Sequence, residues 1–268
     1  MRNQNMLKSL LGASAILAFG LVAVAAPTPV AADDLDRVRD RGVLRVALSG
    51  VYPPFSMTND QNEVVGFDVD IAKEIATRIG VEAEIITTAW DGIIAGLVTG
   101  RFDTIIASMS ITPERQEVVD FVGPYYSAGR TIFVGESSDF QDLDALNGRT
   151  LGVTLGETHE EWARGQAGRD WTLRTYRGLN ELVLEVRNGR IDGFVADSVA
   201  GALAARESGT ALRAIELPGD DGASVDVGIA IRKDNPELAA AMQTALDEMM
   251  EDGTYMDIAM EWIGADIR

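Results

Sequence analysis

Short apolar stretches alternate with amphipathic stretches along most of the chain. Residues 43–48, 81–87 and 102–107 are apolar or alternate with polar residues, which predicts β-strands. Between the first two of these strands, residues 69–79 place isoleucines four positions apart on one helical stripe, and Gly80 follows as a helix end. The order of strands and helices predicts an α/β fold in which a mostly parallel sheet is flanked by helices.

The same alternation repeats between residues 131 and 217, and two helices are expected to close the chain. We expect the chain to pass between the two units near residues 126–130 and to return near residues 224–228. This pattern predicts two similar α/β lobes, with two hinge crossings and a ligand cleft between the lobes. The expected divisions are a signal peptide at residues 1–32, lobe I at 33–127 and 228–268, and lobe II at 128–227.

Polar residues at helix starts act as N-caps because they accept bonds from free backbone N–H groups. Asp68, Asp91, Thr112 and Asn180 stand at such positions, and Asp68 is predicted to be a cap rather than a ligand contact. The segment Ser49–Phe55 carries two prolines, so it is predicted to be a rigid loop at the end of the first strand.

The stretch Ile106–Arg115 carries the most informative chemistry. It opens as a strand with small polar residues, and Thr112 and Pro113 then signal a helix start. Free backbone N–H groups at such a junction suit an anion. Arg115 adds a planar donor that matches a carboxylate. The stretch therefore predicts a seat for a small anionic group.

Composition narrows the possible partners of this 268-residue chain. The net charge of -19 argues against binding to nucleic acid or to an anionic membrane surface. It is compatible with a high-salt habitat or simply with solubility. The chain has no cysteine and one histidine, His159, so disulfides and thiolate metal sites are excluded. No metal and no cofactor is predicted.

The first 32 residues read as an export signal. Arg2 and Lys8 give a positive start, residues 10–26 form an apolar run, and Val30–Ala32 offer small residues for cleavage. A membrane anchor is the alternative, because the apolar run approaches spanning length. The Gly and Ala content and the cleavage-like end favour removal, which predicts a protein of the bacterial periplasm.

Several short motifs occur together in a fixed order. They are Gly50–Phe55, Gly66–Asp70, Trp90–Ile94, Ser108–Arg115, Asp120–Phe121, Pro124–Tyr126, Gly189–Asp192 and Gly228–Lys233. With these motifs in this order, the chain resembles the periplasmic polar amino-acid-binding proteins of ABC importers. That group belongs to extracellular solute-binding protein family 3 and includes histidine- and lysine/arginine/ornithine-binding proteins. The resemblance covers nearly all of residues 33–268. It implies the two-lobe fold of a type II periplasmic binding protein. It also implies a monomer that captures a free α-amino acid and delivers it to an inner-membrane ABC permease.

The resemblance also implies roles for five residues that would hold the head group of the amino acid. Arg115 matches the clamp on the α-carboxylate, Ser110 assists with its backbone N–H, and Ser108 offers its carbonyl to the α-ammonium. From the other lobe, Thr158 matches a carboxylate contact and Asp197 matches the acid that pairs with the ammonium. Thr158 and Asp197 also stand where helix caps are expected.

The side chain of the ligand is less defined. Tyr52 and Trp90 match positions that flank it, although both could be ordinary core aromatics. Ser49 stands where relatives that bind basic amino acids carry an acid, and Glu157 could supply the missing charge. We therefore expect a neutral polar or a basic side chain. His159 could face the cleft or be a solvated helix residue.

Three other functions remain open at this point. Some relatives of the fold are periplasmic dehydratases acting on prephenate- or arogenate-like substrates, and Glu157, His159 and Asp197 could nominally serve as acids. An ectoine-like compatible solute would also use Arg115. A sensor that docks to a receptor would share the ligand site. No enzyme motif such as a nucleophile elbow or a P-loop is present, so a binding protein without catalysis is predicted.

Overall fold

The computed structural model describes residues 34–268, and the predicted signal peptide lies outside them. Within these residues no helix has the length and apolar character needed to cross a membrane. The helices are α1 (Asp34–Arg41), α2 (Phe67–Arg78), α3 (Ile93–Val98), α4 (Pro113–Val118), α5 (Thr158–Gly165), α6 (Leu179–Arg187), α7 (Ser198–Ser208), α8 (Pro236–Asp252) and α9 (Thr254–Trp262), with 3-10 turns η1 (Trp90–Gly92), η2 (Asp144–Leu146) and η3 (Gly219–Gly222). The strands are β1 (Val43–Leu48), β2 (Val51–Tyr52), β3 (Ser56–Thr58), β4 (Val64–Val65), β5 (Glu82–Thr87), β6 (Thr104–Ser110), β7 (Val119–Gly135), β8 (Thr150–Thr154), β9 (Thr172–Tyr176), β10 (Gly193–Asp197), β11 (Leu212–Glu216) and β12 (Ser224–Arg232).

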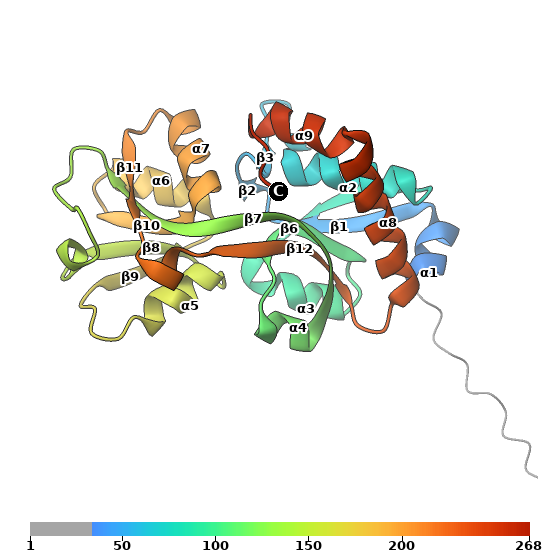
Figure 1. The fold of residues 1–268 in the computed structure, drawn as a ribbon, viewed down its shortest axis with the longest axis horizontal. Coiled ribbons are helices and arrows are strands. Elements are labelled where there is room, and N and C mark those ends of the chain that lie inside the picture. Colours follow the sequence, from blue (N-terminus) through green and yellow to red (C-terminus); the bar gives the residue numbers. More distant parts are fainter. Residues whose placement is uncertain (1–33) are drawn as a thin grey trace, which may run out of the picture. The chain divides into compact units, whose positions relative to one another are not determined.

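Two parallel blocks of strands are joined by two long antiparallel ones. In lobe I, β1 pairs in parallel with both β5 and β6. In lobe II, β8 pairs in parallel with both β9 and β10. The strands β12 and β7 lie between the blocks, so that the hydrogen-bonded path runs β5-β1-β6-β12-β7-β10-β8-β9, and β11 pairs with β7 beside it (Figure 1). The predicted two-lobe α/β fold is confirmed.

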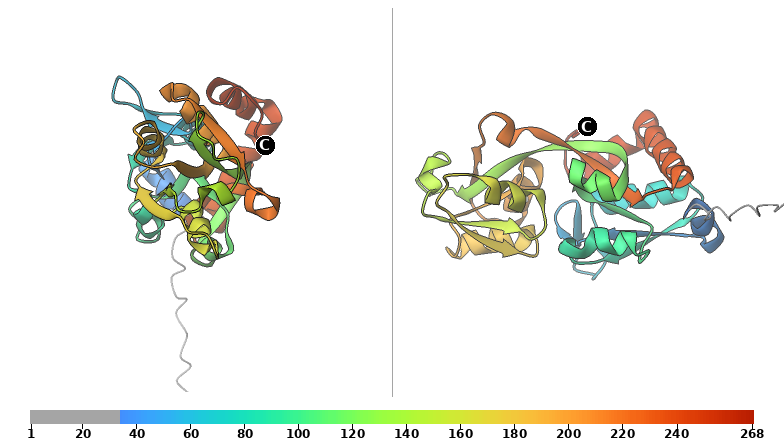
Figure 2. Two further views of the ribbon diagram at one scale, coloured as in Figure 1. Left: turned by 90° about the vertical axis from the view of Figure 1, so that its left-hand side faces the viewer. Right: turned by 90° about the horizontal axis from the view of Figure 1, so that it is seen from below.

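The long strands β7 and β12 make the two crossings between the lobes. The 17 residues of β7 pair first with β12 and then with β10 and β11. Gly129 lies opposite Ser224 and Tyr126 opposite Val227, as expected for crossings near these positions. The right-hand view of Figure 2 shows both strands running from one lobe to the other. The residue boundaries given above for the two lobes stay a prediction.

Helices cover both faces of each block (Figure 1). In lobe I, α2, α8 and α9 lie on one face, where Ile71, Met242 and Tyr255 belong to one buried cluster. On the other face Ile93 and Leu97 of α3 pack against the apolar side chains of the sheet. Lobe II repeats this arrangement with α6 and α7 on one face and α5 on the other. The carboxyl ends of β1 and β6 are left open toward lobe II, where a site can form.

Of the caps predicted at Asp68, Asp91, Thr112 and Asn180, only the one at Thr112 is present. Helices α2, α3 and α6 begin after Gly66, Gly92 and Gly178, without a side-chain cap bond, and so Asp68 lies inside the first turn of α2. Gly66 has a φ of 137°, and a Cβ there would lie 2.4 Å from the carbonyl oxygen of Phe55. Only glycine fits this close approach.

The predicted cap at Thr112 is confirmed. Its Oγ1 accepts a hydrogen bond from the backbone N–H of Arg115 at 3.3 Å, and Pro113 occupies the first position of α4. The helix start therefore fixes where the backbone of Arg115 stands relative to the end of β6.

The long strand β7 begins at Val119 and so contains Pro124. Proline usually ends a central strand because it lacks an N–H donor. Here the pairing with β12 changes register between Val227 and Ile229, at the point that faces Gly123 and Pro124. The bulge removes the need for a donor at the proline. The loop Ser49–Phe55 also holds the two-residue strand β2, which pairs with β3.

Candidate functional site

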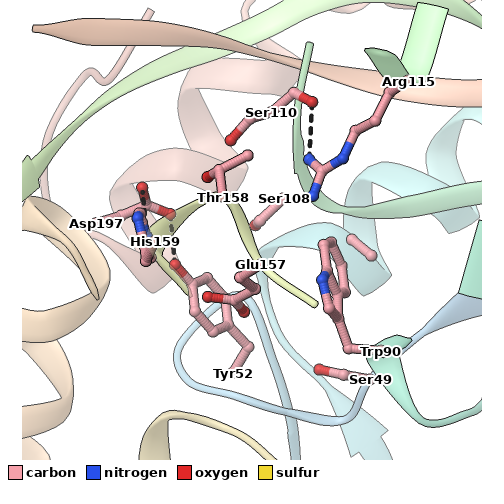
Figure 3. A pocket seen from close by; sticks show the side chains of 11 residues that line it. Ser49, Tyr52, Trp90, Ser108, Ser110, Arg115, Glu157, Thr158, His159 and Asp197 are labelled. Atoms are coloured by element: carbon pink, nitrogen blue, oxygen red, sulfur yellow. Dashed lines mark hydrogen bonds and ion pairs between the residues drawn. The ribbon is translucent and has the colours of Figure 1, made fainter. Parts of the chain in front are cut away.

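A pocket between the two lobes brings together all nine residues predicted for the site (Figure 3). They are Ser49, Tyr52, Trp90, Ser108, Ser110, Arg115, Glu157, Thr158 and Asp197. Lobe I contributes the ends of β1 and β6 and the start of α4, and lobe II contributes the start of α5 and the end of β10. Ala107 and His159 complete the lining.

Arg115 supplies the positive charge of the pocket from lobe I. One terminal nitrogen of its guanidinium donates to the carbonyl oxygen of Ser110 at 2.9 Å, and the group lies over the Trp90 ring at 5.6 Å from the centroid (Figure 3). Burial lowers the pKa of Arg115, and the nearby Glu157 acts in the opposite direction. Arginine stays protonated in proteins, so the pocket contains a fixed cation with further donors in the plane of the group.

Asp197 supplies a negative charge from lobe II. It precedes α7, but its side chain makes no cap bond. One carboxylate oxygen accepts from the Tyr52 hydroxyl at 2.5 Å, and the other lies 3.3 Å from Nε2 of His159. Burial acts to raise the pKa of Asp197, but His159, Tyr52 and Arg130 together hold it below its usual value. Asp197 is therefore ionised at neutral pH.

His159 is buried, with 4% of its surface exposed, so the interpretation as a solvated residue is wrong. Its Nδ1 accepts from Nε of Arg130 at 3.3 Å, and this bond assigns the remaining proton to the Nε2 that faces Asp197. Arg130 also lies over the Trp162 ring at 5.2 Å. Sequence reasoning missed Arg130, although an arginine in an apolar crossing strand is a usable signal.

Ser108 is held in an unusual backbone conformation at the pocket wall. Its φ is 55°, a left-handed value that costs a residue other than glycine about 1–3 kcal/mol. The Ser108 hydroxyl donates to the carboxylate of Asp68 at 2.8 Å, and its N–H donates to the hydroxyl of Tyr125 at 3.0 Å. Tyr125 in turn donates to Asp68 at 2.7 Å. The fully buried Asp68 thus holds Ser108 and Tyr125 in place behind the pocket wall. The helix-cap prediction missed this role.

Burial has the largest effect on the pKa of Asp68. It raises the pKa of Asp68 to about 7, although the hydrogen bonds from Tyr125 and Ser108 oppose the shift. An apolar environment disfavours a charged carboxylate more strongly than two donors can compensate.

Glu157 is the second carboxyl group in the pocket. Burial raises its pKa to about 7, while His159 and Arg115 oppose this and Asp197 reinforces it. Ser49 lies at the opposite end of the pocket from Ser110, as Figure 3 shows. Both carboxyl groups of the lining come from lobe II.

Thr158 is the first residue of α5 and lines the pocket, so it is not the cap. Within residues 34–268 no group of three or more His, Cys, Asp or Glu side chains could hold a metal ion.

The two lobes touch directly around the pocket. The indole N–H of Trp90 donates to the carbonyl oxygen of Gly156 at 3.2 Å, and Tyr52 reaches Asp197 from the opposite lobe. Gly178 approaches Val51 so closely that an added Cβ would lie 2.6 Å from its side chain. These contacts close the lobes over the pocket.

Two lobes of mostly parallel strands flanked by helices and joined by two crossing strands have the fold of a type II periplasmic binding protein. The family described as bacterial extracellular solute-binding proteins, family 3, matches residues 44–265. The chain belongs to this family.

Individual relatives agree with this placement. The L-cystine-binding protein TcyJ of Escherichia coli K12 is 35% identical over 263 residues, which cover 96% of this chain and 97% of the relative. A crystal structure of a mutant ArgBP from T. maritima superposes with a TM-score of 0.79 at 34% identity, covering 86% of this chain and 99% of that one. An ancestral amino-acid-binding protein, a precursor of cyclohexadienyl dehydratase, has a TM-score of 0.79 at 36% identity with the same coverage.

Proposed function

We propose that the protein captures a free α-amino acid in the cleft and delivers it to an inner-membrane ABC permease. The observation that carries this proposal is the pair of opposite charges in one closed pocket, Arg115 from lobe I and Asp197 from lobe II. A zwitterion buried without partners would lose several kcal/mol, roughly, for each unpaired charge. A relative that binds cystine supports this ligand class.

In the proposed complex Arg115 holds the α-carboxylate, with help from the N–H of Ser110 and from Thr158. Asp197 and the carbonyl of Ser108 receive the α-ammonium. The left-handed backbone of Ser108 supports this role, because strained residues cluster where a ligand must be held.

The aromatic side chains Tyr52 and Trp90 flank the side chain of the ligand, which extends toward Ser49 and Glu157. Because the contacts come from both lobes, the ligand binds the closed state better and shifts the population toward it. We propose that the protein acts as a monomer in the periplasm.

A thermal-shift screen tests the proposal with the twenty common amino acids and with compatible solutes such as ectoine. A ligand at 100 times its Kd stabilises the protein by about 2.7 kcal/mol, which raises the melting temperature. Calorimetry of the best ligand then compares wild type with Arg115→Ala, which we expect to lose at least about 3 kcal/mol of binding free energy. Arg101→Ala, an exposed arginine of lobe I, is the matched control.

Two results contradict the proposal. The first is a screen in which no free amino acid raises the melting temperature. The second is an Arg115→Ala variant that binds the ligand as tightly as wild type.

One observation favours a second candidate, a periplasmic dehydratase. Glu157 lies in the pocket with a pKa of about 7, so it is partly protonated at neutral pH and suits proton donation. The relation to a precursor of cyclohexadienyl dehydratase supports the same reaction class. Incubation with prephenate or arogenate, followed by detection of the aromatic product, tests it. Turnover by wild type that is lost in Glu157→Gln would favour the enzyme. If wild type shows no turnover, only the binding function remains.

A further inference from the structure

The Asp197 carboxylate is contacted by one side chain on each of its oxygens. The Tyr52 hydroxyl donates to one oxygen at 2.5 Å, and Nε2 of His159 lies 3.3 Å from the other (Figure 3). Within residues 34–268 no lysine or arginine forms an ion pair with Asp197. A hydroxyl and a neutral imidazole leave the carboxylate its negative charge, which a buried ammonium needs as a partner.

The charge state of His159 therefore decides how much of the Asp197 charge a ligand can use. A neutral imidazole with its proton on Nε2 donates to Asp197 and adds no charge to the pocket. A doubly protonated imidazole would form an ion pair with Asp197 and would repel the ammonium of a ligand. A site for an α-amino acid thus works best when His159 is neutral.

Arg130 contacts the other nitrogen of this imidazole. It stands in the crossing strand β7 directly opposite Asp197 of β10, yet its guanidinium bonds to His159. Nε of Arg130 donates to Nδ1 at 3.3 Å, so Nδ1 acts as the acceptor and carries no proton. The positive charge of the guanidinium also disfavours a second positive charge on the imidazole.

Two further contacts hold Arg130 in place. Its Nη1 donates to the carbonyl oxygen of Asp221 at 3.0 Å, and the guanidinium lies over the Trp162 ring at 5.2 Å. The Trp162 indole N–H in turn donates to the Asp221 carboxylate at 2.8 Å. Burial lowers the pKa of Arg130, while Asp197 and Asp221 oppose this, and an arginine stays protonated in proteins. Arg130 is therefore a permanent charge in a fixed position.

Acidic groups near His159 act against a neutral imidazole. They are Asp197 of β10 and, on α5 and directly before it, Glu157, Glu160 and Glu161. From lobe I, burial raises the pKa of Tyr52, which is neutral, and Arg115 lines the same pocket with its guanidinium bonded to Ser110. Arg130 is the cation that bonds to the imidazole itself.

We propose that Arg130 is a positioning residue that holds His159 neutral, with its single proton on Nε2, so that Asp197 keeps its negative charge for the α-ammonium of the ligand. The inference rests on the proposed capture of an α-amino acid and adds to that site a residue outside the pocket lining. The effect of Arg130 reaches the ligand through two other side chains, so it is a property of the charge state of His159 and not of a direct contact.

NMR of the imidazole nitrogens tests the first step. His159 is the only histidine of the chain, so the signals of an isotopically labelled imidazole belong to it alone. In ligand-free wild type at pH 7 we expect a protonated Nε2 and an unprotonated Nδ1. In Arg130→Met, which removes both the donor and the charge, the doubly protonated imidazole is expected at a pH at least about one unit higher, because a neighbouring charge has effects of this size.

Calorimetry tests the second step with L-glutamine and L-arginine, which share a head group and differ in side chain. As the pH falls from 8 to 5.5, the affinity of Arg130→Met is expected to decrease relative to wild type by at least about threefold, and one pKa unit limits the change to about tenfold. The change should be the same for both amino acids, because it acts on the ammonium. The ratio of wild type to variant at each pH cancels the titration of Glu157 and Asp68, which both proteins share.

Two further variants separate this role from structural support. Arg149→Met removes another arginine of lobe II that lies over a ring, that of Phe140, and is expected to keep the wild-type pH profile. In a His159→Gln background the amide can still donate to Asp197 but does not titrate. Adding Arg130→Met to that background is therefore expected to leave the pH profile unchanged.

Three results overturn the inference. They are a wild-type proton on Nδ1, a loss of affinity in Arg130→Met that is equal at every pH, and a pH-dependent loss that persists in the His159→Gln background. The first needs no variant, so it decides even if Arg130→Met fails to fold. If wild type binds no amino acid at all, the proposed function fails, whereas the NMR comparison still decides whether Arg130 sets the protonation of His159.

Discussion

The buried Asp68 gives a quantitative prediction about stability and pH. Its carboxylate is fully buried, accepts from Ser108 and Tyr125, and has a pKa raised from 3.8 to about 7. A carboxyl group whose pKa is raised by folding binds its proton more tightly in the folded protein. Its contribution to stability is therefore complete below pH 3.8 and is lost as the pH rises through about 7.

The magnitude follows from the two pKa values. At about 1.36 kcal/mol for each pKa unit, the change from 3.8 to about 7 corresponds to about 4 kcal/mol of unfolding free energy. Asp68→Asn has no proton to lose, so it removes this pH dependence. We expect the unfolding free energy of the variant, relative to wild type, to rise by about 1.4 kcal/mol for each pH unit between pH 4 and 7.

The assay is urea denaturation of the ligand-free protein at pH 4, 5, 6 and 7. Taking the difference between variant and wild type at each pH cancels the titration of the other groups. Asp60→Asn, which removes the same charge from an exposed turn, is the control. A difference between Asp68→Asn and wild type that stays constant from pH 4 to 7 would refute the reasoning, since Asp68 would then be ionised throughout and stabilised by its two donors.

Three further variants probe closure of the lobes. Gly178→Ala places a Cβ 2.6 Å from the Val51 side chain. The overpacking cost of about 1–3 kcal/mol should weaken ligand affinity, while the urea midpoint of the ligand-free protein stays unchanged. Equal ligand affinity in the variant and in wild type would contradict the contact between the closed lobes. Tyr52→Phe removes one of the two buried donors to Asp197 and should cost about 1–3 kcal/mol of binding, measured by calorimetry. Trp90→Phe removes only a half-exposed bond between the lobes and should cost less than Tyr52→Phe; the reverse order would contradict this ranking.

Features encoded by neighbouring residues were predictable from the sequence. The strand and helix order follows from local periodicity, and the cap at Thr112 follows from a polar residue directly before a proline. The nine site residues were assigned from the resemblance to the family, and five of them lie within the quoted motifs. The pocket contains all nine.

Features that depend on distant contacts were not predictable in this way. Asp68 looked like a helix cap because caps are the usual role of an aspartate before an apolar helix. Its partner Ser108 lies 40 positions away, and only the fold brings the two together. In the same way Arg130 and His159 are 29 positions apart, and neither showed its partner in the sequence.

The same distinction explains why the head group of the ligand is easier to infer than its side chain. Every α-amino acid presents the same two charges, so a local motif around Arg115 and an acid at the end of β10 suffice to indicate it. In the proposed complex the side chain extends toward Ser49 and Glu157, which come from opposite lobes. We therefore expect substitutions at Ser49 or Glu157 to change which ligand is preferred without removing the contacts to the head group.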